Sequence, residues 1–201
     1  QAYRAGIFPM AEDAAQDDLF WLDPDPRGIL PLDQFHISRS LARVIKRRPL
    51  KFVVNRDFQS TVIACTDRDE TWINAPLMDL YLGLHDLGHA HAFEIWDTDQ
   101  CLGGVFGINV GAAFCGESMY SSAPNGSKLA LAFLVTHLAR QGFTLFDTQF
   151  LTDHLARLGG VEISKDAYHM ALDQALLTTP DPTLGPLPTC QDVLHRKTQT
   201  S

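Results

Sequence analysis

The sequence predicts an α+β fold with a mostly antiparallel sheet, and three observations predict it. Three β-like runs follow one another with short turns between them, the most regular helix of the chain comes next, and a strand–helix–strand stretch follows that helix. A meander of strands followed by segregated helices is typical of this class. The 201 residues, of which 45% are hydrophobic and 20% charged, are enough to bury a core and exclude wholesale disorder.

The N-terminal part of the chain combines irregular structure with a first helix. Residues 1–35 are rich in proline, aspartate and aromatic side chains, which indicates irregular structure packed onto a larger body. Over 38–48, Leu41 and Ile45 fall on one helical face and basic residues fall on the other. Pro49 ends this helix, because the residue before a proline is pushed out of the helical region.

Two more helices are expected before the central strands. A strand over 51–54 is followed by Asn55 and Asp57, either of which suits the N-cap of a short helix. The next helix has Pro76 in its first turn, where the missing N–H is not needed, and Gly88 ends it.

The centre and end of the chain alternate between strands and helices. The expected strands are 89–96, 101–109, 112–120, 143–147 and 161–164. The expected helices are 127–140, 152–158 and 166–177. Gly142 closes the longest helix, and Ser127 or Asn125 is expected to cap its start.

We expect three parts along the chain. A small N-terminal domain takes residues 1–70, a larger domain takes 71–177, and a proline-rich tail takes 178–201. The tail is expected to be extended or loosely ordered, because prolines concentrate at its start. The sequence begins with Gln1 rather than Met, so we also expect an N-terminal truncation.

The charge distribution favours contact with a small piece of polyanion. The net charge of −8 is opposite to that of proteins that bind nucleic acid through bulk positive charge. Within 34–56, however, there are seven cations and no anion: Arg39, Arg43, Lys46, Arg47, Arg48, Lys51 and Arg56. The alternative is that these side chains form an ordinary solvated helix face.

Cysteine usage and hydropathy predict a reducing cytoplasm. The four cysteines lack any CxxC spacing, so free thiols are favoured over zinc sites or disulfides. The longest apolar run, 129–135, is too short to span a bilayer, and we find no signal peptide.

Metal and covalent chemistry are disfavoured by the residue patterns. His89 and His91 share a strand face, but Glu94 points to the other face, so partnered polar residues are favoured over a metal site. Cys115 lies in a run typical of a buried strand, and Ser118 lacks the Gly-x-Ser-x-Gly elbow of a serine nucleophile. Phosphate-binding loops of the Rossmann or Walker type are absent from the sequence.

Three polar residues at apolar strands are the strongest candidates for a site. Asp147 and Gln149 follow a buried strand and project to the same side if the chain stays extended. Glu117 lies in another apolar run, where a carboxylate needs a cationic partner. That cation is either Lys128 or Arg140 in an internal salt bridge, or a group of the substrate.

A set of short motifs in fixed order resembles the bacterial leucyl/phenylalanyl-tRNA–protein transferases over residues 2–172. The motifs are Ala2-Tyr-Arg-Ala-Gly6-Ile-Phe-Pro9, Pro24-Asp-Pro-Arg27-Gly, Phe35-His-Ile-Ser-Arg-Ser40, Thr71-Trp72-Ile, Gly88-His-Ala-His91, Phe114-Cys-Gly-Glu117-Ser-Met119, Ser127-Lys128-Leu-Ala-Leu131, Asp147-Thr-Gln149 and His154-Leu-Ala-Arg-Leu-Gly159. Each motif is weak alone, but the ordered set is specific.

The resemblance implies a fold and a reaction. The fold is a small N-terminal domain plus a domain similar to the GNAT acyltransferases. The reaction transfers Leu or Phe, with Met as a further candidate donor, from aminoacyl-tRNA to the α-amine of proteins that start with Arg or Lys, which marks them for N-degron degradation. The resemblance implies no metal and no organic cofactor. We also expect a cytoplasmic monomer without membrane contact.

The resemblance also assigns roles to residues. The catalytic set is Glu117, which engages the cationic acceptor N-terminus, Gln149, which positions the amine or accepts its proton, and Asp147, which polarises Gln149. The expected substrate-binding residues are Trp72, Val105, Met119, Ser121, Leu131, Leu134 and Leu138. The expected tRNA-binding residues are Arg39, Arg43, Lys46, Arg47 and Arg48.

The sequence departs from the family at Met10, where many relatives have Trp, and at Leu134 and Leu138, where some have Phe. The size of the donor pocket is therefore open. Two other functions remain as alternatives: an acetyl-CoA-dependent acetyltransferase and a non-catalytic binder of basic N-termini. Gly126 is the only glycine in the sequence between Ser122 and Lys128, before the long helix. A glycine-rich pyrophosphate loop, which an acetyltransferase would need there, is therefore disfavoured.

Overall fold

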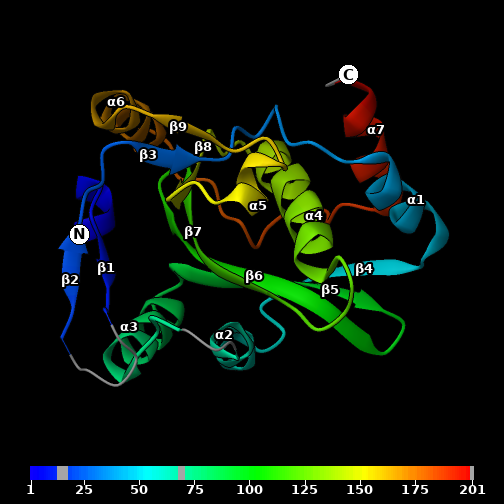
Figure 1. Cartoon of the computed structure of the whole chain (residues 1–201), viewed down its shortest axis with the longest axis horizontal. Helices are drawn as coiled ribbons and strands as arrows, with labels where there is room; N and C mark the ends of the chain where they lie inside the picture. The colour runs from blue at the N-terminus through cyan, green and yellow to red at the C-terminus, as the bar shows by residue number, and fades with distance from the viewer. Residues whose placement is uncertain (13–17, 68–70, 200–201) are drawn as a thin grey trace.

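The chain folds around one mixed sheet (Figure 1), and the computed structural model describes residues 1–12, 18–67 and 71–199. The seven strands of this sheet run in the order β4–β5–β6–β7–β8–β3–β9, and a separate ribbon pairs β1 with β2. The strands are β1 (Phe8–Met10), β2 (Phe20–Leu22), β3 (Arg27–Ile29), β4 (Leu50–Val54), β5 (Ala90–Asp97), β6 (Gln100–Val110), β7 (Ala113–Ser121), β8 (Leu145–Gln149) and β9 (Val161–Ile163). Neighbouring strands are antiparallel except β7 and β8, so the predicted α+β class with a mostly antiparallel sheet is confirmed.

Helices cover both faces of the sheet. They are α1 (Arg39–Arg47), α2 (Phe58–Thr66), α3 (Ala75–Asp86), α4 (Gly126–Gln141), α5 (Asp153–Ala156), α6 (Lys165–Ala175) and α7 (Cys190–Gln199), and a 3₁₀ helix spans Ala2–Ala5. Figure 1 shows α4 on one face of β5–β7, and α2 and α3 on the other. Among the described residues, apolar cores lie beneath α4, beneath α2 and α3, and, as a smaller cluster, beneath α6.

Local capping explains most helix starts. The side chains of Ser38, Asp57 and Asn74 each accept a backbone N–H in the first turn of α1, α2 and α3. Asp57 is therefore the cap of α2, whereas Asn55 accepts a hydrogen bond from Ala92 N on β5.

The start of α4 differs from the prediction. Asn125 occupies the N-cap position with a φ of 69° but makes no side-chain cap hydrogen bond. Instead the Ser121 hydroxyl, on β7, accepts the Ser127 N–H at 2.9 Å. A Cβ on Gly126 would lie 1.8 Å from the Leu102 carbonyl oxygen, so only glycine allows α4 to start this close to β6.

The C-terminal tail was predicted wrongly as extended or loosely ordered. Residues 190–199 form α7, which packs on α1 and α4. Val193 is completely buried in the α4 core, and Arg196 Nη1 donates to the Val135 carbonyl at 3.0 Å. Burial of this apolar residue outweighs the helix-breaking composition upstream.

The predicted boundary at residue 70 does not coincide with a break in the sheet. β3 and β4 both precede that boundary and both lie in the sheet of β5–β9. The expectation of only irregular structure over residues 1–35 is wrong for β3, which pairs with β8 and β9. The division into three domains stays a prediction.

The pairing of β7 with β8 ends early and opens the sheet. The two strands pair over Ala113–Cys115 and Leu145–Asp147, and beyond this point β7 continues beside β6. Glu117 and Gln149 each lie two residues past the last paired position. The separation of two parallel strands therefore places both polar side chains at one opening.

The four cysteines, all within the described residues, form no disulfide, as predicted: Cys65 and Cys115 are buried, and Cys101 and Cys190 are partly buried. Across the described ranges, none of the helices combines the length and hydropathy needed to cross a membrane.

Candidate active site

A mostly apolar cavity of about 400 Å³ lies at the opening between β7 and β8. Its walls come from β1, β6, β7, β8, the first turns of α4, and α5. Seven of the predicted site residues line it: Trp72, Val105, Glu117, Met119, Ser121, Leu131 and Gln149. A volume of this size is in the range of small-ligand sites.

Three predicted site residues lie outside this lining. Leu134 and Leu138 are completely buried in the core beneath α4 and do not line the cavity, so their assignment to the donor pocket stays a prediction. Their spacing with Leu131 correctly predicts a shared helix face, but that face passes from the cavity into the core. Asp147 is also buried behind the cavity wall.

Glu117 is a buried carboxylate held by neutral donors. Its side chain is 6% exposed and accepts hydrogen bonds from the Tyr81 hydroxyl at 2.8 Å and from Gln149 Nε2 at 3.1 Å. Burial raises the pKa of Glu117 to about 7, although the Tyr81 hydrogen bond opposes this shift.

Of the two alternatives for Glu117, the internal salt bridge to Lys128 or Arg140 is not formed. Arg140 pairs with Asp192 at 3.1 Å, and in the described parts of the chain no ion pair reaches Glu117. The cavity therefore ends at a carboxylate that lacks a cation.

Two tyrosines near Glu117 are site residues that sequence reasoning missed. Burial and the charge of Glu117 raise the pKa of both Tyr3 and Tyr81, so both remain neutral hydroxyls. The buried Tyr3 hydroxyl has no hydrogen-bond partner among the described residues. Tyr3 stands in the first family motif, which was a usable signal, whereas Tyr81 gives the sequence only an apolar helix position.

The chain leaves the extended conformation at Gln149, so the condition under which Asp147 and Gln149 would project to the same side is not met. Gln149 has a φ of 61°, in the left-handed region. Its backbone N–H donates to Asp147 Oδ1 at 2.8 Å, whereas its side-chain amide bonds Glu117. Asp147 therefore contacts the Gln149 backbone and leaves the amide free to face the cavity.

Asp147 lies in a buried ion pair. Arg27, which is 1% exposed, donates to Asp147 through Nε at 2.9 Å and through Nη2 at 2.6 Å. The Tyr168 hydroxyl donates to the same carboxylate at 2.8 Å. Arg27 and Tyr168 were not predicted, although Arg27 is part of a family motif.

The remaining polar candidates are bound within the protein. His91 contacts Asn55, Asn109 and the Gly88 carbonyl, and Glu94 accepts hydrogen bonds from Thr61, Trp96 and Tyr120. The predicted partnered polar residues are therefore confirmed. Burial raises the pKa of the Cys115 thiol well above its ordinary value, which disfavours a nucleophilic thiolate.

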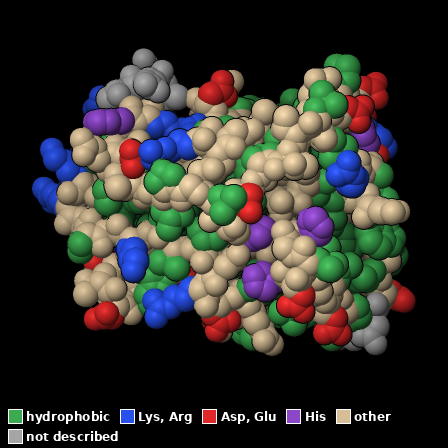
Figure 2. All heavy atoms as spheres, turned by 180° about the vertical axis from the view of Figure 1, so that it is seen from behind, with side chains coloured by type: hydrophobic (Ala, Val, Ile, Leu, Met, Phe, Trp, Pro, Cys, Tyr) green, Lys and Arg blue, Asp and Glu red, His purple; other side chains and the backbone are tan. Residues whose placement is uncertain are grey.

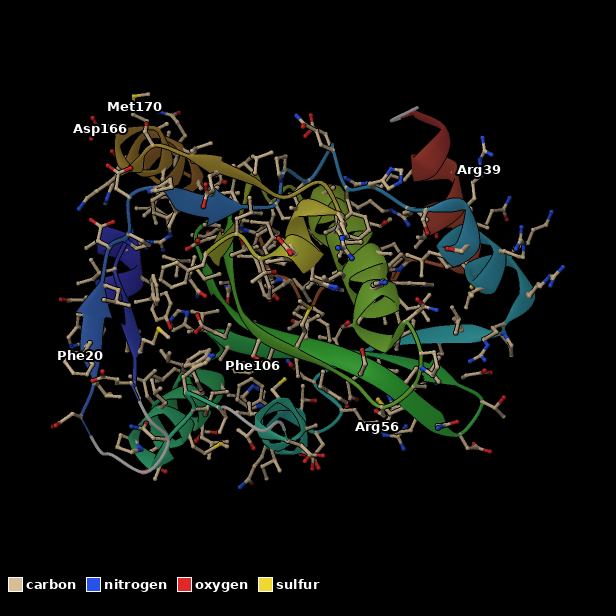
Figure 3. The ribbon with its side chains drawn as sticks, viewed as in Figure 1. Phe20, Arg39, Arg56, Phe106, Asp166 and Met170 are labelled. Carbon is tan, nitrogen blue, oxygen red and sulfur yellow. The ribbon has the colours of Figure 1, made fainter. Side chains whose placement is uncertain are left out.

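The five predicted tRNA-binding cations are all exposed on or just after α1. This basic face, defined by Arg39, Arg43, Lys46, Arg47 and Arg48, lies at the end of the molecule opposite α6 (Figure 1). In Figure 3, Arg39 points away from the body at this end, and in Figure 2 most Lys and Arg side chains of the rear face gather in the same half. Arg48 pairs with Asp97 at 3.3 Å.

Comparison with known proteins gives consistent family matches. The family model described as leucyl/phenylalanyl-tRNA protein transferase matches residues 29–173, and the model of its N-terminal domain matches residues 1–25. Among solved structures, the one titled "The structure of L-PGS from Bacillus licheniformis" has a TM-score of 0.48 at 14% identity, covering 76% of this chain and 65% of that one.

Three curated relatives carry the name leucyl/phenylalanyl-tRNA–protein transferase. The relative from Cereibacter sphaeroides is 52% identical and covers 100% of this chain and 94% of its own. The relative from Ruegeria sp. (strain TM1040) is 51% identical, and the match covers 100% of this chain and 95% of that relative. The relative from Dinoroseobacter shibae is 52% identical, and the match covers 94% of this chain and 84% of that relative. The chain therefore belongs to the leucyl/phenylalanyl-tRNA–protein transferase family.

Proposed function

We propose that this protein transfers Leu or Phe from aminoacyl-tRNA to the N-terminal α-amine of proteins that start with Arg or Lys. The observation that carries the proposal is the buried Glu117 carboxylate, which lies beside Gln149 at the end of an apolar cavity and forms no ion pair with any residue that the structure describes. A substrate must supply a cation at one end of this cavity and an apolar group at the other. In this family the acceptor protein supplies the cation at its N-terminus, and the aminoacyl-tRNA supplies the apolar Leu or Phe side chain.

Glu117 binds the cationic N-terminus of the acceptor. An ammonium group beside Glu117 favours the ionised carboxylate, so binding lowers the pKa of Glu117 from about 7. Tyr81 and Gln149 leave the carboxylate with room for a charged donor, since a carboxylate accepts about four hydrogen bonds.

The apolar part of the cavity holds the donor side chain. Val105, Met119 and Leu131 line it, and the unbranched Met119 adapts to either Leu or Phe. Trp72 and Met10 line the same cavity and offer surfaces for the terminal adenosine, with Met10 giving less stacking area than the Trp of many relatives.

The reaction needs orientation more than strong acid–base catalysis. The α-amine nitrogen attacks the ester carbonyl carbon, the bond from that carbon to the ribose oxygen breaks, and the amine proton ends on the ribose oxygen. Gln149 orients the amine, because a neutral amide is a very poor base. The ammonium group first loses one proton to water, since the pKa of an α-amine is about 8, and after the attack the second proton passes to the leaving ribose oxygen.

The basic face on α1 binds the tRNA acceptor stem. Replacing both Arg43 and Arg47 with Gln should weaken tRNA binding and lower the slope of log K against log salt by roughly 1.5–2 units. The control replaces the exposed Arg4 and the partly buried Lys165, which pairs with Asp23, both at the other end of the molecule, and should leave the slope unchanged. An equal slope for both double variants would reject this role of α1.

The direct test of the function is transfer of radiolabelled Leu, Phe and Met from charged tRNA to an Arg-starting peptide, with an Ala-starting peptide as control. Transfer of Leu or Phe to the Arg peptide alone is the expected result and also ranks the donors. Binding of the Arg peptide without transfer would indicate a non-catalytic binder. Thermal stabilisation by acetyl-CoA, with none by an aminoacyl-adenosine analogue, would indicate an acetyltransferase.

A further inference from the structure

The cluster around Arg27 joins three parts of the chain behind the cavity wall. Arg27 lies on β3, Asp147 on β8 and Tyr168 on α6, which are neighbours at one end of the sheet (Figure 1). Arg27 Nη1 also donates to the Gly6 carbonyl at 2.9 Å, and Nη2 contacts the Tyr168 hydroxyl at 3.1 Å. The guanidinium carbon lies 4.1 Å from the centre of the Tyr168 ring. Together these contacts hold the Arg27 guanidinium in one orientation.

Asp147 has its hydrogen-bonding positions filled by this cluster. The carboxylate accepts two bonds from Arg27, one from Tyr168 and one from the Gln149 backbone, which is about the number that a carboxylate can accept. Asp147 is completely buried and is not part of the cavity lining. It therefore influences the reaction only through the residues that it holds.

The residue that Asp147 holds is Gln149, in a backbone conformation that needs support. A non-glycine residue in the left-handed region is uncommon and costs about 1 kcal/mol or more. The bond from Gln149 N to Asp147 Oδ1 fixes this turn, and the turn directs the Gln149 amide toward Glu117. A small rotation of the Asp147 carboxylate would change the position of that amide.

We propose that Arg27 and Tyr168 are positioning residues for aminoacyl transfer, acting through Asp147 and the Gln149 turn on the amide that orients the acceptor amine. The proposal rests on the proposed function. The bond from Arg27 to Gly6 extends the same control to the N-terminal segment that carries Tyr3, so the two sides of the Glu117 site are held by one guanidinium.

The test compares two variants that each remove one buried hydroxyl donating to a carboxylate. Tyr168→Phe removes the bond to Asp147 and keeps the ring against Arg27, whereas Thr61→Val removes the bond to Glu94, at 3.1 Å and away from the cavity. Tyr168→Phe should lower Tm more than Thr61→Val, since it also deletes the bond from Arg27 Nη2 to the Tyr168 hydroxyl, so the comparison depends on kcat and not on Tm. Tyr168→Phe should reduce kcat about tenfold with the KM of both substrates unchanged, and Thr61→Val should keep kcat within about twofold.

An unchanged kcat for Tyr168→Phe in an active wild-type background would overturn the inference, because the cluster would then serve stability alone. Absence of transfer by the wild type would instead reject the proposed function, so the two failures are distinct. Combining Tyr168→Phe with Asp147→Asn should give the kcat of Asp147→Asn alone, and losses that multiply would contradict action through Asp147. If Asp147→Asn fails to fold, the comparison of Tyr168→Phe with Thr61→Val decides by itself.

Discussion

Two buried carboxylates stand on either side of the opening between β7 and β8, and their surroundings are opposite. Asp147 meets the Arg27 guanidinium, the Tyr168 hydroxyl and a backbone N–H, whereas in the described parts of the chain Glu117 accepts hydrogen bonds from the neutral Tyr81 and Gln149 side chains. Within the fold, Arg27 neutralises the charge of Asp147, whereas the charge of Glu117 is left for a substrate cation to neutralise. Of these two carboxylates, the one that lines the cavity is the one that no ion pair of the described chain reaches.

The largest expected effect on stability comes from removing Arg27, the cation of the buried Arg27–Asp147 ion pair. Arg27→Met should lower the free energy of unfolding by about 3–5 kcal/mol, because it leaves the Asp147 charge buried and unpaired. Urea unfolding measures this change. A loss below about 1 kcal/mol would mean that water or another group compensates Asp147, and the contrast with Glu117 would fail.

The second effect concerns substrate binding at Glu117. Glu117→Gln should reduce kcat/KM for an Arg-starting acceptor about a hundredfold, since one charge-assisted contact is lost, while the KM for aminoacyl-tRNA changes little. Steady-state kinetics with each substrate varied in turn separates the two. Equal losses against donor and acceptor would assign Glu117 to the structure rather than to the acceptor.

The same substitution should stabilise the free protein at alkaline pH. The folded pKa of Glu117, about 7, is above its ordinary value, so the folded state is favoured by the bound proton, and this stability is lost as the pH rises through 7. Glu117→Gln should therefore exceed the wild type in unfolding free energy by about 1–3 kcal/mol at pH 8 and equal it near pH 4. A variant less stable than the wild type at both pH values would show that Glu117 is a structural anchor.

The smallest expected effect is a shift in the pKa of Glu117 when its neutral hydrogen-bond donor Tyr81 is changed. Tyr81→Phe removes one hydrogen bond that lowers the pKa of Glu117, so the ionisation of Glu117 should shift upward by about one pH unit. The acidic limb of the profile of kcat/KM for the acceptor against pH reports this shift. Tyr168→Phe is the control, and it should leave that limb in place because its hydroxyl bonds Asp147.

The sequence predicted the elements whose signals are local. Helix α1 follows from its apolar face, the Ser38 side chain at its start and Pro49 after it, and the meander β5–β7 follows from its alternation. β3 was missed because three residues give no periodicity, and its pairing with β8 and β9 is purely tertiary. Helix α7 was missed because the burial of Val193 outweighs the composition around it.

Site residues could be predicted where a polar side chain stands in an apolar stretch of sequence. They could not be predicted where their role depends on contacts that only the folded chain makes. Glu117 was recognisable as a carboxylate in an apolar run, and the structure places it at the cavity beside Gln149. Its partner Tyr81 was not, because a tyrosine on an apolar helix face gives no sign of which carboxylate it meets. Likewise, only the fold separates Leu131, which lines the cavity, from Leu134, which lies in the core.

The central claim, that the acceptor completes the charge of Glu117, is tested most directly by proton release on binding. An Arg-starting peptide titrated calorimetrically into the wild type at pH 6.5, in two buffers of different ionisation enthalpy, should release roughly 0.5–1 proton as Glu117 ionises. Glu117→Gln should release none. Equal proton release by both proteins, or tight binding of the peptide to both, would contradict the claim.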